Sequence, residues 1–519
     1  MKRLLRTAAT VITLTAATVL TGCATNPVTG KNELRLFGEN WELQTGAQQY
    51  APSRQSQGGD YEVDPGVQAY VSEVGQRIAE HSDRKLPYEF TVLNNSVPNA
   101  WALPGGKIAI NRGLLTELDS EAELAAVLGH EIVHAAAGHG AQGAQRGVLL
   151  QGAVLGAAVA ASGSRYSNLA TMGASVGAQL INTKYGRDAE RESDKYGMEY
   201  MSEAGYDPQA AVSLQETFVR LSEGRNQDFL SGLFASHPPS QERVKNNREK
   251  AAELPPGGDI GADRYHAQLR TLFADKEAYE AYDKAQKALA DGDTKTARSL
   301  AQQAIRLQPR EGHFHSLLGD IEASQKNRDA AVRRYTDAIA RNDQFFYYYL
   351  RRGLLNEELN RDTQARQDLE RSIELFPTAN AYNALGDLSL AARDVDSAKK
   401  YYSTAAGSDS PAGLAARESL LDLDFPANPG QYLQLRQRVN ADGSIDVQIA
   451  NPTGRDVTGL TVGVNYIDAS GKARTTRQDL KGTLSAGQST VVKLAVAVDP
   501  AQANRVATAI TAAQLAPRR

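Results

Sequence analysis

The spacing of apolar residues changes along the chain and separates it into regions with different predicted structure. Between residues 65 and 255, the stretch VQAYVSEVGQRIAEH has apolar residues at helical spacing, whereas YEFTVLNN and GKIAINRG are typical of short strands. The sequence LPGG between the two strands predicts a turn. A further helix is expected over DSEAELAAVLGHEIVH, because Ser120 and Glu123 form a capping box at its start. We therefore expect an α+β domain over residues 65–255.

Residues 278–425 are predicted to form a repeat of paired helices, preceded by a linker at 256–277. Small residues recur at spacings of 34, 34 and 33 residues: Ala285, Gly319, Gly353 and Gly386. Alanine recurs with the same spacings: Ala297, Ala331, Ala365 and Ala398. This period resembles the tetratricopeptide repeat, in which small residues lie where the two helices of a pair touch. We expect an α-solenoid that ends in a capping helix.

Residues 426–519 follow strand-like rather than helical patterns. The stretches SIDVQIA, GLTVGVNYID and STVVKLAVAV alternate or run apolar, are rich in Val, Ile and Thr, and are separated by turn-forming residues. This pattern predicts a β-sandwich of the immunoglobulin-like type. The region contains no recognisable chemistry, so a spacer or a binding module is the role we expect for it.

The first 22 residues have the pattern of a lipoprotein signal peptide. MKRLLR is cationic, residues 7–20 form a short apolar run, and LTGC follows. LTGC resembles the bacterial lipobox, so we expect Cys23 to be lipidated and residues 23–64 to form a tether with a helix. Ala24 then favours the outer membrane, and the periplasmic face of that membrane is the expected location. An ordinary cleavage site that contains a cysteine is the alternative.

Composition narrows the function classes. The hydrophobic share of 41% and the charged share of 23% are ordinary for a folded soluble protein. A net charge of −4 and a pI of about 6.1 indicate no surface for nucleic acid. Cys23 is the single cysteine, which excludes an intramolecular disulfide.

The Gly- and Ala-rich segment 141–182 is expected to be a buried or mobile helix near a site, or a lid; a membrane-dipping segment is the alternative.

The stretch LGHEIVHAAAGHG contains the clearest chemical signal. His130 and His134 are four residues apart and share one face of a helix, so both can bind one ion. Glu131 is rotated by about 100° from His130, which places it beside the metal as a base and not as a ligand. Zinc is the expected metal, with one ion per chain. A catalytic zinc has three protein ligands and an open position.

The sequence offers two candidates for the third ligand. His139 lies five residues after His134, on the wrong face of a continuous helix, and we expect a helix-end or solvated side chain there. The later helix GRDAERESDKYGMEYM places Glu190 and Asp194 on one face. Glu190 is the expected ligand, and Asp194 is expected to accept a hydrogen bond from the outer nitrogen of a ligand histidine. Glu192 is expected to be a solvated charge.

Two further residues follow in ASHPPSQERVKNN, at the start of a predicted helix. His237 or Arg243 could stabilise the oxyanion of a tetrahedral intermediate over the open zinc position. Alternatively, His237 could occupy that position and block water. A histidine bonded to backbone at the helix start is the third possibility for His237. The sequence leaves these alternatives open.

Taken together, these motifs resemble those of the HtpX and CAAX-prenyl-protease family of zinc metallopeptidases. The resemblance rests on NPVTG, NAWALPGGKIAINRGLL, GHEIVHAAAGH, YGRDAERESDKYG and SHPPSQER, and the repeats extend it to the periplasmic, BepA-like branch. It implies a zincin-like α+β metallopeptidase domain, with His130, His134 and Glu190 as ligands and Glu131 as general base. It also implies that His237 and Arg243 belong to the site.

The resemblance implies a substrate-binding strand and a role in the cell. The strand of Lys107, Ile108, Ala109, Ile110 and Asn111 would form the sheet edge that binds an extended substrate. The implied function is an endopeptidase that degrades misfolded or stalled envelope proteins and assists outer-membrane protein assembly, with the assembly machinery as partner of the repeats. Two alternatives stay open: a chaperone or scaffold whose proteolysis is secondary or held off, and a repeat adaptor on an inactive protease.

Overall fold

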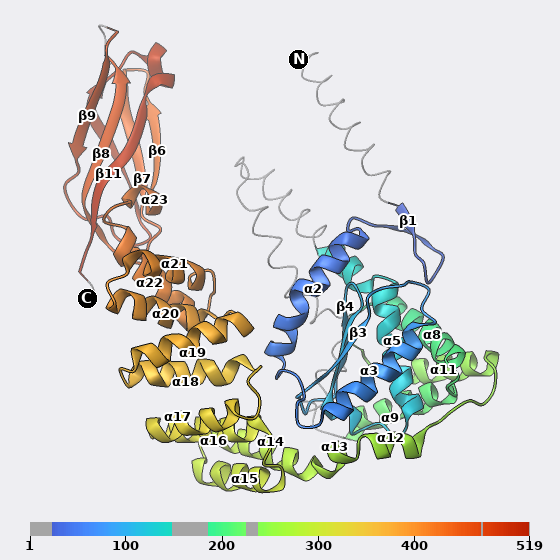
Figure 1. Ribbon diagram of the computed structural model, residues 1–519. Helices are drawn as coiled ribbons and strands as arrows, with labels where there is room; N and C mark the ends of the chain where they lie inside the picture. Colours follow the sequence, from blue (N-terminus) through green and yellow to red (C-terminus); the bar gives the residue numbers. More distant parts are fainter. Residues whose placement is uncertain (1–22, 148–184, 225–236, 469–470, 518–519) are drawn as a thin grey trace, which may run out of the picture. The chain divides into compact units, whose positions relative to one another are not determined.

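The computed structural model describes residues 23–147, 185–224, 237–468 and 471–517 (Figure 1). The chain divides into two compact units, Met1–Arg352 and Gly353–Arg519, and the boundary falls inside helix α18 (Phe346–Glu358). The predicted signal peptide and most of segment 141–182 lie outside the described residues. Within the described ranges, no helix is both long enough and apolar enough to cross a bilayer.

A three-stranded sheet lies in the first unit, in the order β3 (Glu89–Leu93), β5 (Lys107–Asn111), β4 (Ala100–Leu103). β3 is parallel to β5, whereas β4 is antiparallel to it. β4 was not predicted, because its four residues are all buried and show no alternation. β5 is paired on both sides, so the expectation that Lys107, Ile108, Ala109, Ile110 and Asn111 form a free edge is wrong. Among the residues that the structure describes, no further strand pairs with the outer side of β4, which is therefore a free edge of the sheet.

Helix α5 (Glu121–Ala136) is buried along its whole length and carries the HExxH motif. Ser120 caps it as predicted, since its hydroxyl accepts a hydrogen bond from the Glu123 N–H at 3.2 Å. A Cβ on Gly129 would lie 2.8 Å from the carbonyl oxygen of Gly197 in α8 (Arg187–Glu203). These small residues let the backbones of α5 and α8 approach closely. That approach brings His130 and His134 of α5 close to Glu190 and Asp194 of α8.

Other helices of the first unit pack either on this pair or on the sheet (Figure 1). They are α2 (Glu39–Ser56), α3 (Pro65–Ala79), α4 (Arg112–Leu115), α9 (Gln209–Gly224) and α11 (Gln241–Glu253). Helix α2 packs on the sheet, where the Tyr50 hydroxyl donates to the Ile108 carbonyl at 2.7 Å.

The N-terminal region is folded and does not hang as a free tether. β1 (Cys23–Thr25) and β2 (Asn32–Leu34) form an antiparallel hairpin. The buried Asn26 amide donates to the carbonyl of Ala137 at the end of α5, at 3.0 Å. The hairpin is therefore attached to the C-terminal end of the helix that carries the motif.

The predicted linker at 256–277 is also folded. It contains α12 (Ala262–Gln268) and α13 (Arg270–Ala274), and Tyr265 is fully buried with its hydroxyl on the Leu115 carbonyl at 2.6 Å. The repeats begin directly after it, with α14 (Lys276–Ala290), α15 (Thr294–Leu307), α16 (Gly312–Ser324) and α17 (Arg328–Ile339).

The repeat positions show the predicted contacts between paired helices. A Cβ on Gly319 would lie 3.0 Å from the ring of Tyr335 in the first unit. In the second unit, a Cβ on Gly386 would lie 2.5 Å from the ring of Tyr402. The aromatic ring of the partner helix therefore fills the space that a side chain at the glycine position would need.

The second unit continues the repeats and ends in a β-sandwich. Its helices after α18 are α19 (Asp362–Leu375), α20 (Ala379–Ala391), α21 (Val395–Ala405), α22 (Pro411–Asp424) and α23 (Pro429–Tyr432). One antiparallel sheet has the order β10 (Ser489–Ala497), β7 (Ser444–Ala450), β6 (Gln434–Val439). The other has the order β11 (Ala507–Leu515), β8 (Val457–Ile467), β9 (Ala473–Asp479).

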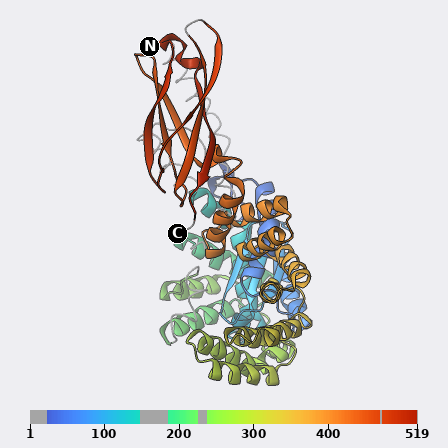
Figure 2. The ribbon, with the colours of Figure 1, turned by 90° about the vertical axis from the view of Figure 1, so that its left-hand side faces the viewer.

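The two sheets enclose one apolar core, and their long strands are visible in Figure 2. Leu421 of α22 and Phe425 directly after it belong to this core. The predicted domain boundary at residue 426 therefore separates side chains that pack together. Six strands lie within the described part of this region, against seven in the smallest immunoglobulin pattern.

Candidate metal centre

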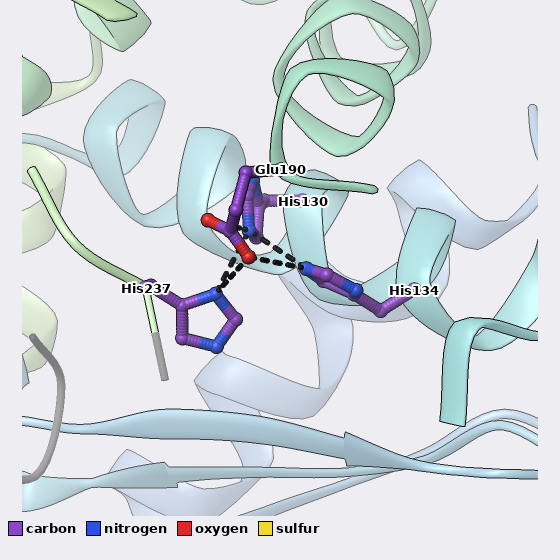
Figure 3. A group of neighbouring side chains, drawn as sticks. All are labelled: His130, His134, Glu190 and His237. Carbon is purple, nitrogen blue, oxygen red and sulfur yellow. Dashed lines mark hydrogen bonds and ion pairs between the residues drawn. The ribbon is translucent and has the colours of Figure 1, made fainter. Parts of the chain in front are cut away.

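Four side chains from three segments converge in the first unit (Figure 3). His130 and His134 come from α5, Glu190 from α8 and His237 from the segment just before α11. One ligand atom from each residue lies within 4.8 Å of the others. The structure thus brings together the three predicted zinc ligands and His237.

The distances between these atoms fit a tetrahedral zinc site. Nε2 of His130 lies 3.0 Å from Nε2 of His134 and 3.2 Å from Nδ1 of His237. Oε1 of Glu190 lies 3.4 Å from Nε2 of His134 and 2.9 Å from Nδ1 of His237. A tetrahedron with Zn–N bonds of ~2.0–2.1 Å has edges of roughly 3.3 Å. Three imidazole nitrogens and one carboxylate oxygen are also donors that zinc prefers.

Glu131 lies beside this group and has no hydrogen-bond partner at one oxygen. It is buried, its Oε1 lies 3.6 Å from Nε2 of His237, and its Oε2 accepts no hydrogen bond from any residue that the structure describes. Burial raises the pKa of the Glu131 carboxyl above its ordinary value. A raised pKa suits a group that must both take and return a proton.

The outer nitrogen of His130 is held by an acidic side chain, as predicted. Nδ1 of His130 lies 3.0 Å from Oδ1 of Asp194. Burial opposes the charge on Asp194, but the Arg243 guanidinium lowers the pKa of this carboxyl below its ordinary value. Asp194 therefore stays an acceptor for His130 and fixes the orientation of its ring.

Arg243 does not occupy the position expected for an oxyanion donor. Its Nε and Nη2 each donate to Asp194 at 2.7 Å, and its Nη1 lies 2.9 Å from Oε2 of Glu190. A buried guanidinium needs such partners, because an unpaired charge would be costly inside the protein. Arg243 holds two acidic residues of the site in place.

His139 also differs from expectation. It is buried, its Nδ1 lies 3.0 Å from Nδ1 of His134, and its Nε2 lies 3.4 Å from Oε2 of Glu192. Helix α5 ends at Ala136, and Gly138 adopts a φ of +71°, so the chain turns before His139. His139 is not among the converging ligands, as predicted, but it contacts one of them, and Glu192 is not a free solvated charge.

Tyr185 was not identified from the sequence, and it covers one side of the site. Its ring stacks on His134 with centroids 3.9 Å apart, and its hydroxyl lies 3.5 Å from the carbonyl oxygen of Ala102 in β4. A cavity of about 40 Å³ lies beside His130 and Glu131. This space is small for a peptide.

Two family models match the chain. Peptidase family M48 matches residues 65–251, which contain all four converging side chains. The tetratricopeptide repeat matches residues 282–331 and 323–380, in agreement with the repeat predicted from the sequence.

Curated proteins with related sequences carry protease names. The chain is 31% identical to "Metalloprotease YcaL" of Escherichia coli K12 over 37% of its own length and 76% of that protein. It is 26% identical to the "Beta-barrel assembly-enhancing protease" of Yersinia pestis, over 64% of this chain and 75% of that one. The protein of that name in Escherichia coli O157:H7 is 25% identical, but the match spans only 62% of its length and 53% of this chain. From the matched motifs and from its identity to YcaL, the chain belongs to peptidase family M48.

Proposed function

We propose that the protein is a zinc-dependent endopeptidase of the bacterial envelope. The observation that carries this proposal is the group of His130, His134, Glu190 and His237 with the buried carboxylate of Glu131 beside it, one oxygen of which accepts no hydrogen bond from the described residues. When bound there, zinc would lower the pKa of water and polarise a peptide carbonyl. Glu131 then takes the proton of the attacking water and passes it to the leaving amine.

We propose further that His237 is the fourth zinc ligand in a resting state of the enzyme. Its Nδ1 points at the other three ligand atoms, and its Nε2 faces Glu131. In that position it takes the place that a catalytic site keeps open for water. Movement of His237 would open the site, and the same side chain could then face a developing oxyanion.

The free edge of β4 is the proposed binding site for an extended substrate. The Asn111 N–H donates to the Asn99 carbonyl at 2.8 Å, and the alternation of an antiparallel ladder then turns the N–H and C=O groups of Ala100 and Ala102 away from β5. Pairing with an exposed strand would hold peptides of many sequences. Tyr185 must leave the Ala102 carbonyl for this pairing to form.

The names of the relatives suggest the clients and the location. Two of them are called beta-barrel assembly-enhancing proteases. We propose that the clients are misfolded or stalled outer-membrane proteins, that the repeats bind a protein partner in outer-membrane assembly, and that lipid on Cys23 holds the chain at the periplasmic face of the outer membrane. Replacement of Cys23 by serine should then release the protein from the membrane fraction in cell fractionation.

The test of proteolysis uses Glu131→Gln. We expect this variant to bind as much zinc as wild type, because Glu131 is not a ligand. Its rate of cleavage of an unfolded outer-membrane β-barrel protein should fall by ~10²–10⁴-fold, the usual contribution of a general acid–base group. Equal cleavage rates in the two proteins would refute the proposed mechanism.

A test of the substrate strand uses Ala102→Pro, with Ala102→Ser as its matched control. Proline removes an N–H that faces away from β5, so the sheet itself keeps its hydrogen bonds. We expect cleavage to fall by about tenfold in Ala102→Pro, through a higher KM, while zinc content and the serine variant stay as in wild type. An unchanged KM would show that substrate does not pair with β4.

A chaperone or assembly scaffold is the second candidate function. The position of His237 favours it, because a side chain that takes the water position of a catalytic zinc keeps the site from cleaving. Complementation separates the two functions. If Glu131→Gln restores a deletion strain as well as wild type, the scaffold function is the main one; if it does not, proteolysis is required.

A further inference from the structure

The two ligand histidines of α5 have different surroundings at their outer nitrogens. Nδ1 of His130 faces the carboxylate of Asp194, whereas Nδ1 of His134 faces Nδ1 of His139 at 3.0 Å. His134 presents its Nε2 to the other ligand atoms. A metal at Nε2 needs the lone pair of that nitrogen, so the proton of His134 must be on Nδ1. His134 is then the donor, and Nδ1 of His139 must accept.

The acceptor role of His139 fixes its own tautomer. With a lone pair on Nδ1, its proton is on Nε2, and Nε2 lies 3.4 Å from Oε2 of Glu192. The other oxygen of Glu192, Oε1, lies 2.6 Å from Nζ of Lys31. Every donor in this series therefore faces an acceptor: His134 to His139, His139 to Glu192, and Lys31 to Glu192.

The backbone around His139 holds it in this place. Gly138 has a φ of +71°, a conformation that residues with a side chain rarely adopt, and this turn ends α5 and returns His139 towards His134. Asn26 of the N-terminal segment bonds the carbonyl of Ala137 at 3.0 Å. Lys31 comes from the same segment, in the turn between β1 and β2. The segment 23–34 thus contacts both the backbone and the side chains behind His134.

We propose that His139 is a positioning residue for the zinc ligand His134, kept in its accepting tautomer by Glu192 and supported by Lys31 of the N-terminal hairpin. The proposal rests on the zinc site proposed above. Partners of this kind orient a ligand ring and raise its basicity, and their loss weakens metal binding by about 10–100-fold. His139 acts through His134 and does not touch the reacting atoms.

The test measures zinc affinity by competition with a chelator, so it does not depend on a substrate. We expect His139→Ala to lose about 10–100-fold in affinity. In His139→Asn, the side-chain oxygen takes the place of Nδ1 and can accept the N–H of His134, so affinity should stay within ~3-fold of wild type. His81→Ala is the control, because His81 pairs with Glu203 and belongs to no part of the site.

Two further measurements separate positioning from folding. The d–d absorption of the cobalt-substituted protein reports ligand geometry, and we expect it to change in His139→Ala and not in His139→Asn. The midpoint of thermal unfolding in EDTA reports the fold without metal. If His139→Ala does not fold, Glu192→Ala replaces it. Glu192 is only partly buried, and its replacement removes the partner of Nε2 and should also lower zinc affinity.

The outcomes distinguish this inference from the proposed function. A wild-type protein that binds no zinc would overturn the zinc site itself. A wild-type protein that binds zinc, together with an alanine variant of equal affinity, would overturn only the role of His139. Equal losses in His139→Ala and His139→Asn would also overturn it, because the hydrogen bond would then not be the cause.

Discussion

The metal centre and the cluster around Glu311 in the first unit are built from the same kinds of side chain. Both are buried, and both combine histidine with glutamate. At the start of α16, Oε2 of Glu311 accepts hydrogen bonds from Asn94 at 2.9 Å and Tyr279 at 2.6 Å, while Oε1 accepts one from the backbone N–H of His313 at 2.8 Å. Each oxygen of Glu311 therefore has a donor.

The metal centre is different, because hydrogen-bond acceptors there face one another instead of facing donors. Nε2 of His130 and Nε2 of His134 are directed at the same point, and Oε2 of Glu131 and Nε2 of His237 have no hydrogen-bond partner. Most buried polar groups in proteins are hydrogen-bonded, so those that are not require an explanation. The comparison indicates that residue types alone do not distinguish a structural cluster from a site: the state of their hydrogen bonds does.

The largest expected effect is the response of the metal centre to zinc. Zinc added to metal-free protein should raise its stability by about 4 kcal/mol at a free concentration a thousand times the dissociation constant, since it binds only the folded state. His134→Ala should abolish this response in calorimetry. His313→Asn, in the Glu311 cluster, should keep it, even if the metal-free protein is less stable. A zinc response that disappears in both variants would break the distinction between the clusters.

A smaller effect is expected when the satisfied cluster is broken. Glu311→Ala leaves the donors of Asn94 and Tyr279 buried without their acceptor, and a loss of this kind costs about 1–3 kcal/mol. We expect a lower thermal midpoint with unchanged zinc binding per folded molecule. The exposed Glu280, which is paired with Lys284 one turn away, is the control, and its replacement by alanine should have an effect of less than about 0.5 kcal/mol. Loss of zinc affinity in Glu311→Ala would contradict the assignment.

The ligands and the repeats could be predicted because they depend on local periodicity. The spacing of His130 and His134 determines a shared helix face, and the 34-residue period identifies Gly319 and Gly386 before any contact is seen. The conformation of the backbone at single residues was harder to predict from the sequence. Helix periodicity places His139 on the wrong face only if α5 is continuous, and Gly138 ends the helix just before that residue. A glycine four residues after the second histidine was the available signal.

Features that depend on distant pairing were the least predictable. The sequence of β5 does not reveal that a second strand, β4, covers it, because β4 is short and wholly apolar. Arg243 was expected over the metal, yet its partners are set by α8, which is far from it in the sequence. The apolar side chains of Leu421 and Phe425 gave no sign that they complete the core of the β-sandwich rather than that of the repeats. These contacts follow from tertiary packing.

The smallest expected effect concerns a third kind of buried acid, one placed among like charges. Burial, together with Asp387, Asp362 and Glu358, raises the pKa of Glu357 in the second unit to about 7. A raised carboxyl pKa means that the folded state favours the protonated form, so the associated stability is present below the unfolded pKa near 4.5 and is lost as the pH rises through 7.

Glu357→Gln removes this dependence, because glutamine stays neutral. At pH 8 the variant should be more stable than wild type by about 1 kcal/mol or less, given solvent screening of a half-buried group, and at pH 4.5 the two should be equal. Chemical denaturation at both pH values measures the difference, with Glu370→Gln, at a partly exposed residue of the same unit, as the control. A difference of the same size at both pH values would show that burial of the side chain, and not its ionisation, is responsible. Glu357 would then resemble the satisfied cluster around Glu311 more than the metal centre, because its effect on stability would come from packing alone.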